Sequence, residues 1–107
     1  MPTINETTPE SKAESKARED ALFAALAALN TPEDLRRFMM DLCTPKEVSD
    51  FAERWLIARM LYEGSLSYRE ISAQTGASTT TVGRVARFLQ QEPHQGYKLI
   101  LERGKPL

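Results

Sequence analysis

Residues 45–63 predict a helix that carries apolar side chains on nearly every face. These side chains are Val48, Phe51, Ala52, Trp55, Leu56, Ile57, Ala58, Met60, Leu61 and Tyr62. A helix that is apolar all round is normally a buried one. A chain of 107 residues has little material left to surround such a helix. We therefore expect a second subunit to cover it, and the alternative is a central helix wrapped by helices of its own chain.

Three sequence signals mark helix starts and indicate an all-helical chain. In each, a hydroxyl residue stands three positions before a carboxylate, at Thr31-Pro32-Glu33-Asp34, Thr44-Pro45-Lys46-Glu47 and Ser67-Tyr68-Arg69-Glu70. The hydroxyl can accept a hydrogen bond from a free backbone N–H, while the carboxylate reaches back to the cap residue. Proline is tolerated in the first helical turn, where its missing N–H costs nothing. The three signals predict helices that begin near residues 32, 45 and 68.

The remaining chain completes one helical domain over residues 16–107. Residues 1–15 are polar and charged, so we expect a disordered N-terminal arm. A first helix over about 16–30 places Leu22, Leu26 and Leu29 on one stripe. A short helix follows over 32–42, and a final one over about 96–103 adds another apolar patch. No stretch alternates as a strand would, which predicts an all-α fold of about six helices.

Residues 67–90 have the pattern of a helix-turn-helix. Gly76 is predicted to form the turn, because glycine adopts the left-handed conformation without penalty. Small side chains flank it at Ser72 and Ala77, and Ile71 is the buried anchor of the preceding helix. The following helix buries positions at i, i+3, i+4 and i+7, which are Val82, Val85, Ala86 and Leu89. The weak point is Thr75, where an aliphatic anchor is more usual.

The opposite face of the second helix, over residues 78–90, has the features of a major-groove reader. The predicted contacts are Arg69 on the preceding helix and then Ser78, Thr79, Thr80, Thr81, Gly83, Arg84 and Arg87. The first turn lacks the acidic residue that a helix N-terminus favours, which leaves its positive end free for phosphates or base edges. Gly83 costs about 1 kcal/mol relative to alanine in mid-helix. That cost is explained if DNA or another backbone comes close at this position.

Charge and composition narrow the function classes. The net charge is −1, but residues 64–107 carry six basic and three acidic side chains, so positive potential lies near the helix-turn-helix. No apolar run is long enough to span a membrane, and no secretory signal is evident. One cysteine and one histidine leave no material for a metal site, and nothing indicates a cofactor. A cytoplasmic protein is the expectation.

Protein binding and catalysis are the two function classes to compare with DNA binding. A helical dimer could use the face over residues 79–87 to bind a protein partner, and the modest basicity keeps that interpretation open. An enzyme is not expected, because no nucleophile–base pair or paired carboxylates stand apart from the capping residues.

The stretch from Leu42 to Leu89 resembles the Trp repressor superfamily. The shared features are Thr44-Pro45-Lys46-Glu47, Arg54 within a long apolar helix, Glu63-Gly64 at its end, Ser67-x-Arg69-Glu70 and Thr75-Gly76-Ala77. The chain is more similar to the shorter Trp-repressor-like branch called YerC/YecD. That likeness lies in Asp41-Leu42-Cys43-Thr44, Gly76-Ala77-Ser78-Thr79, Gly96-Tyr97-Lys98-Leu99 and Leu101-Glu102-Arg103. Together these motifs extend over most of residues 18–103.

This resemblance implies an intertwined homodimer that binds double-stranded DNA and represses or otherwise regulates transcription. It also implies a tryptophan pocket, in which two arginines that match Arg54 and Arg84 hold the indole. A glycine and a serine beside the second arginine match Val85 and Phe88 here, and both of these are bulky. We therefore expect the protein's own side chains to fill the pocket. A different effector, or none, is expected instead of tryptophan.

Overall fold

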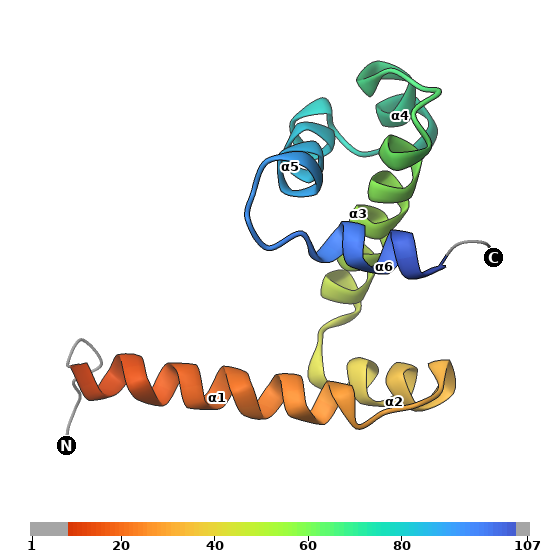
Figure 1. Ribbon diagram of the computed structural model, residues 1–107. Helices are drawn as coiled ribbons and strands as arrows, with labels where there is room; N and C mark the ends of the chain where they lie inside the picture. Colours follow the sequence, from red (N-terminus) through yellow and green to blue (C-terminus); the bar gives the residue numbers. More distant parts are fainter. Residues whose placement is uncertain (1–8, 105–107) are drawn as a thin grey trace. The chain divides into compact units, whose positions relative to one another are not determined.

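The computed structural model describes residues 9–104, and this part of the chain contains six helices and no strand (Figure 1). The helices are α1 (Pro9–Ala27), α2 (Pro32–Leu42), α3 (Pro45–Glu63), α4 (Tyr68–Thr75), α5 (Thr79–Gln90) and α6 (Gly96–Gly104). The predicted all-α fold of about six helices is confirmed. None of these helices is both long and apolar enough to cross a membrane.

The chain divides into two compact units, one up to Leu42 and one from Cys43 onward. The single domain predicted over residues 16–107 stays a prediction.

The first unit contains α1 and α2. Helix α1 begins at Pro9, so residues 9–15 of the predicted arm are helical, while its first eight residues lie outside the described part. Alanine, glutamate and lysine dominate residues 10–19, and these are strong helix formers even where no apolar surface is buried. An i,i+4 ion pair between Lys16 Nζ and Asp20 Oδ2, 3.1 Å apart, adds local support. The helix ends at Ala27, three residues earlier than predicted, so Leu29 lies beyond it. Leu22, Leu26 and Leu29 are each half-buried.

The predicted capping signals account for the helix starts. The Thr44 hydroxyl accepts from Glu47 N at 3.1 Å, and Glu47 Oε1 accepts from Thr44 N at 2.8 Å. Ser67 and Glu70 repeat both bonds at the start of α4, with distances of 3.1 and 2.8 Å. At Thr31 the hydroxyl accepts from Asp34 N at 3.1 Å. All three starts are confirmed, because the interactions that set them are local.

The core of the second unit forms where α4, α5 and α6 pack around α3 (Figure 1). Its buried members are Ile57, Ala58, Ile71, Ala77, Val82 and Val85, and the partly buried Trp55, Met60, Leu61, Leu66 and Tyr97 pack against them. The face of α5 predicted to be buried is confirmed, since Ala86 and Leu89 are also buried. The centroids of the Trp55 and Tyr97 rings lie 6.4 Å apart, and this stack joins α6 to α3.

Helix α3 is only partly covered by the helices of its own unit. Ile57 and Ala58 are fully buried, but Phe51 is 43% exposed, Tyr62 37% and Leu56 36%. Helix α6 leaves Leu99 and Ile100 about half exposed as well. Helices α4, α5 and α6 therefore do not wrap α3 completely, as the alternative of a central helix covered by its own chain would require.

Candidate nucleic-acid interface

The turn between α4 and α5 is built around Gly76. Its φ of 82° and ψ of −5° lie in the left-handed region, as predicted. Its N–H donates to Ser72 O at 2.9 Å and so closes the last turn of α4. A side chain at this φ would be strained, because Cβ would crowd the following carbonyl. The glycine therefore sets the direction in which α5 leaves the turn.

Thr75 supports the turn with its hydroxyl rather than with an aliphatic side chain. Thr75 Oγ1 donates to Ile71 O at 2.8 Å and accepts from Ala77 N at 3.1 Å. On the other side of the turn, Ser72 Oγ donates to Ala77 O. These bonds satisfy backbone groups beside the buried Ile71 and Ala77, where an unpaired polar atom would be costly. The structure thus explains why a threonine stands at position 75, where a helix-turn-helix usually has an aliphatic residue.

The first turn of α5 contains four hydroxyl residues in two environments. Ser78 is the N-cap, whose hydroxyl accepts from Thr81 N at 3.0 Å and donates to Thr81 Oγ1 at 3.1 Å. Ser78 and Thr81, both predicted as DNA contacts, therefore stabilise the first turn of α5. Thr79 and Thr80 are exposed, and the turn contains no acidic residue. The N-terminal end of α5 thus presents hydroxyls and a positive dipole end to solvent.

The outward face of α5 lies opposite its buried face. Thr79, Thr80, Arg84 and Arg87 are exposed on it. A methyl group added at Gly83 would meet no other atom within 4 Å. No close contact within the described chain therefore requires a glycine at position 83. Five of the predicted site residues, Thr79, Thr80, Gly83, Arg84 and Arg87, share this face of α5.

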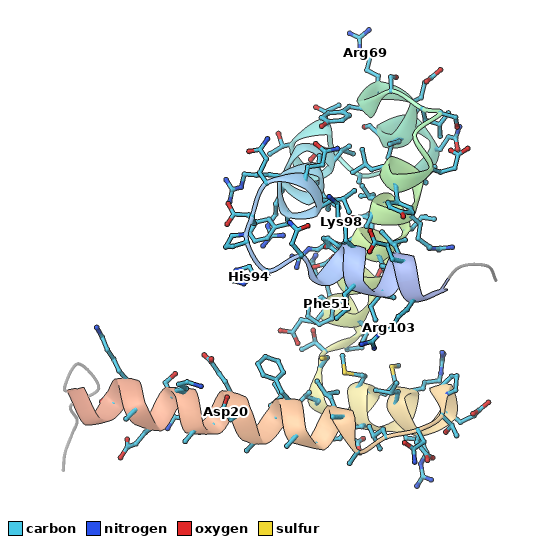
Figure 2. The ribbon with its side chains drawn as sticks, in the orientation of Figure 1. Asp20, Phe51, Arg69, His94, Lys98 and Arg103 are labelled. Carbon is cyan, nitrogen blue, oxygen red and sulfur yellow. The ribbon has the colours of Figure 1, made fainter. Side chains whose placement is uncertain are left out.

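Arg69 belongs to the same unit but to a different helix. It lies in the first turn of α4 and is exposed. Figure 2 shows its side chain projecting from α4 away from α3, α5 and α6. It thus reaches solvent from a different helix than the arginines of α5.

Phe88 and Glu92 were not predicted as partners of the α5 arginines. The Arg84 Cζ atom lies 4.4 Å from the centroid of the Phe88 ring, and Arg87 Cζ lies 5.1 Å from it. Arg87 Nε also lies 3.3 Å from Glu92 Oε2. The i,i+4 spacing of Arg84 and Phe88 was the available signal in sequence, because such pairs meet on a helix surface. Glu92 lies beyond the end of α5, where helical spacing indicates nothing.

The ligand pocket considered from the sequence, over Arg54, Arg84, Val85 and Phe88, stays a prediction. Val85 is fully buried in the core, and Arg54 lies over the ring of Phe51, with Cζ 5.7 Å from the centroid. Arg84 and Phe88 line one cavity, of about 290 Å³. Its other lining residues are His94, Gln95, Gly96 and Tyr97, from the α5–α6 connection and the start of α6.

The chain is similar to known proteins over most of its length. Residues 17–105 match the family described as Trp repressor protein. The uncharacterised protein YerC of Bacillus subtilis (strain 168) is 42% identical over 86 residues, which cover 80% of this chain and 81% of YerC.

Two solved structures are similar in both fold and sequence. A crystal structure of a candidate Trp repressor from Staphylococcus aureus aligns with a TM-score of 0.75 and 38% identity, over 81% of this chain and 85% of that one. A TrpR-like protein from Eubacterium eligens ATCC 27750 aligns with a TM-score of 0.72 and 32% identity, over 92% and 91% of the two chains. The family match extends over most of the chain and agrees with both structures. The chain therefore belongs to the Trp repressor family.

Proposed function

We propose that this protein is a DNA-binding transcriptional regulator, most simply a repressor, that reads the major groove as a homodimer with residues 78–90. The outward face of α5 is the observation that carries the proposal. It exposes two threonines and two arginines without an acidic residue in the first turn, opposite a fully buried apolar face. Membership of the Trp repressor family supports the same conclusion.

The roles of the side chains follow from their positions on the helices. Thr79 and Thr80 stand at the N-terminal end of α5, the end that enters the groove in helix-turn-helix proteins. Arg84 and Arg87 can bind phosphates or donate to guanine, and Arg69 can bind the DNA backbone from α4. Ser78 and Thr81 contribute by holding the first turn of α5. Gly83 allows the sugar-phosphate surface to approach the helix closely.

The homodimer is supported by the apolar surface that the second unit leaves uncovered. Phe51, Leu56 and Tyr62 on α3, with Leu99 and Ile100 on α6, are each more than a third exposed. Large exposed apolar side chains of this kind are characteristic of an interface with another subunit. A two-fold dimer would present its α5 helices to half-sites about one helical turn apart, or roughly 34–36 Å, and would favour a palindromic operator.

Tryptophan is not proposed as the effector. Val85 contributes to the core instead of leaving space beside Arg84, and the Phe88 ring occupies the position next to that guanidinium. Both positions that the resemblance would need to be small are therefore bulky here, and we expect an effector other than tryptophan, or none.

Salt dependence of duplex binding tests the proposed function. Binding of a mixed-sequence DNA duplex should fall linearly on a plot of log affinity against log salt, because each neutralised phosphate releases counterions. The double variant Arg84→Ala/Arg87→Ala should lower the slope by about two. The matched control is Arg18→Ala/Arg36→Ala, which removes the same charge from exposed positions of the first unit.

Two outcomes would overturn the proposal. The first is undetectable duplex binding at low salt. The second is an equal loss in both double variants, which would point to general charge rather than to the α5 face. Either would favour the alternative in which the face over residues 79–87 binds a protein partner.

A further inference from the structure

We propose that Phe88 is a positioning residue of the α5 face, whose ring holds the guanidinium groups of Arg84 and Arg87 before DNA arrives. This inference rests on the proposed DNA-binding function and deepens it. The observation that carries it is the convergence of two cations on one ring, with Cζ-to-centroid distances of 4.4 Å for Arg84 and 5.1 Å for Arg87.

The ring of Phe88 offsets the repulsion between the positive charges of Arg84 and Arg87. Arg84 and Arg87 are spaced i,i+3 on α5, so their like charges lie on neighbouring positions of the helix surface. The face of an aromatic ring carries negative potential and attracts a cation within about 6 Å of its centroid. Both guanidinium groups lie within that distance of the same ring. Phe88 therefore lets the helix carry two adjacent positive charges on its exposed side.

An aromatic contact leaves every N–H donor of an arginine free for DNA, whereas a carboxylate contact occupies part of them. A guanidinium over a ring keeps its five N–H donors available, since a ring is not a strong acceptor. The Glu92 carboxylate, in contrast, takes up the Nε side of Arg87 at 3.3 Å. Arg84 is thus held without losing a donor. Restraining a long side chain in advance reduces the entropy that it loses on binding.

The ring of Phe88 lies beside the α5–α6 connection. Phe88 is half-buried, and it is flanked in sequence by Arg87 and by the buried Leu89. Its side chain lines the cavity of about 290 Å³ together with Gln95, Gly96 and Tyr97. The ring is thus partly covered without belonging to the buried core. A role in packing alone is the competing explanation, and the test below separates the two.

The test compares variants that keep or remove the ring at similar volume. Phe88→Leu keeps an apolar side chain but loses the ring, and Phe88→Tyr keeps the ring. We expect Phe88→Leu to bind a mixed-sequence duplex at low salt about tenfold more weakly, equivalent to about 1.4 kcal/mol. Phe88→Tyr should stay within about twofold of the parent protein, because it preserves the cation–π contacts. Circular dichroism melting and mass by light scattering check that each variant folds and assembles, and Phe88→Met replaces Phe88→Leu if the latter does not fold.

The second measurement is made in the Arg84→Ala/Arg87→Ala background. If Phe88 acts through the arginines, adding Phe88→Leu there should change affinity by less than about twofold, because a double-mutant cycle removes effects that do not depend on the partners. An equal tenfold loss in that background would show a structural role and overturn the inference.

A spectroscopic measurement examines positioning in the absence of DNA. In the free protein, NMR resonances of the Arg84 and Arg87 side-chain protons should be shifted upfield by the ring current of Phe88. The shift should persist in Phe88→Tyr and vanish in Phe88→Leu. Unshifted arginine resonances in the parent protein, or undiminished duplex binding by Phe88→Leu, would refute the positioning role while leaving the proposed function intact. Absence of duplex binding by the parent protein would instead refute the proposed function.

Discussion

Arg87 Nε lies 3.3 Å from Glu92 Oε2, so a carboxylate beyond the end of α5 is paired with an arginine of the outward face. The side chains are 56% and 33% exposed. An ion pair at this exposure contributes only about 0–1 kcal/mol to stability. Its larger effect concerns charge, because it places a negative group beside a surface that we propose meets phosphates.

Glu92→Gln should therefore bind duplex DNA more tightly than the parent protein. The substitution removes a negative charge that competes with phosphates for Arg87 and repels the DNA backbone, so duplex affinity should rise at each salt concentration. We expect a gain of several-fold at low salt, measured by fluorescence anisotropy across a salt series. The control is Glu102→Gln, which makes the same charge change at an exposed position of α6. An equal gain in the control would attribute the effect to net charge.

Gly83→Ala should raise the free energy of unfolding and lower the affinity for DNA. A methyl group at this position meets no atom within 4 Å, so the helix gains propensity at no packing cost. The free energy of unfolding should rise by up to about 1 kcal/mol, measured by thermal or urea denaturation. Duplex affinity should fall, because the added methyl lies on the face that approaches the groove. Unchanged affinity with raised stability would contradict the close approach proposed at Gly83.

Thr75→Val should weaken the turn although it restores the more usual aliphatic side chain. The substitution removes the hydroxyl that donates to Ile71 O and accepts from Ala77 N. Since Ala77 is buried, its N–H would lose its partner, and the free energy of unfolding should fall by about 1–3 kcal/mol. Urea denaturation measures the change, and Thr75→Ser, which keeps the hydroxyl, is the control. A valine variant as stable as the serine variant would show that the two bonds contribute nothing.

Leu99→Glu should dissociate the proposed dimer without unfolding the second unit. Leu99 is 52% exposed on α6, so the core loses little, while a charge at a subunit interface would be desolvated at high cost. Light scattering should report about half the parent mass at low concentration. Tyr68→Glu changes a similarly exposed residue on α4 and should leave the mass unaltered. A dimeric Leu99→Glu protein would exclude Leu99 from the interface.

The features that were predictable from the sequence are those set by neighbours along the chain. The starts of α2, α3 and α4 follow from capping residues within one turn, and the turn at Gly76 follows from the conformational freedom of glycine. The buried face of α5 follows from the spacing of its apolar residues. The start of α1 was predicted too late, at residue 16 instead of Pro9. Apolar periodicity cannot detect a helix that charged helix formers sustain by propensity alone.

Only the tertiary structure shows which apolar side chains are buried and which charged groups meet. The sequence determined that α3 is apolar all round, but only packing shows that its own unit buries Ile57 and leaves Phe51 exposed. Likewise, sequence placed Arg84 and Arg87 on one helix face, whereas the pairing of Arg87 with Glu92 depends on how the chain continues after α5. Local interactions set helix boundaries and faces because they act within one or two turns. Which groups meet across the end of a helix depends on the path of the chain in space, and sequence spacing does not encode that path.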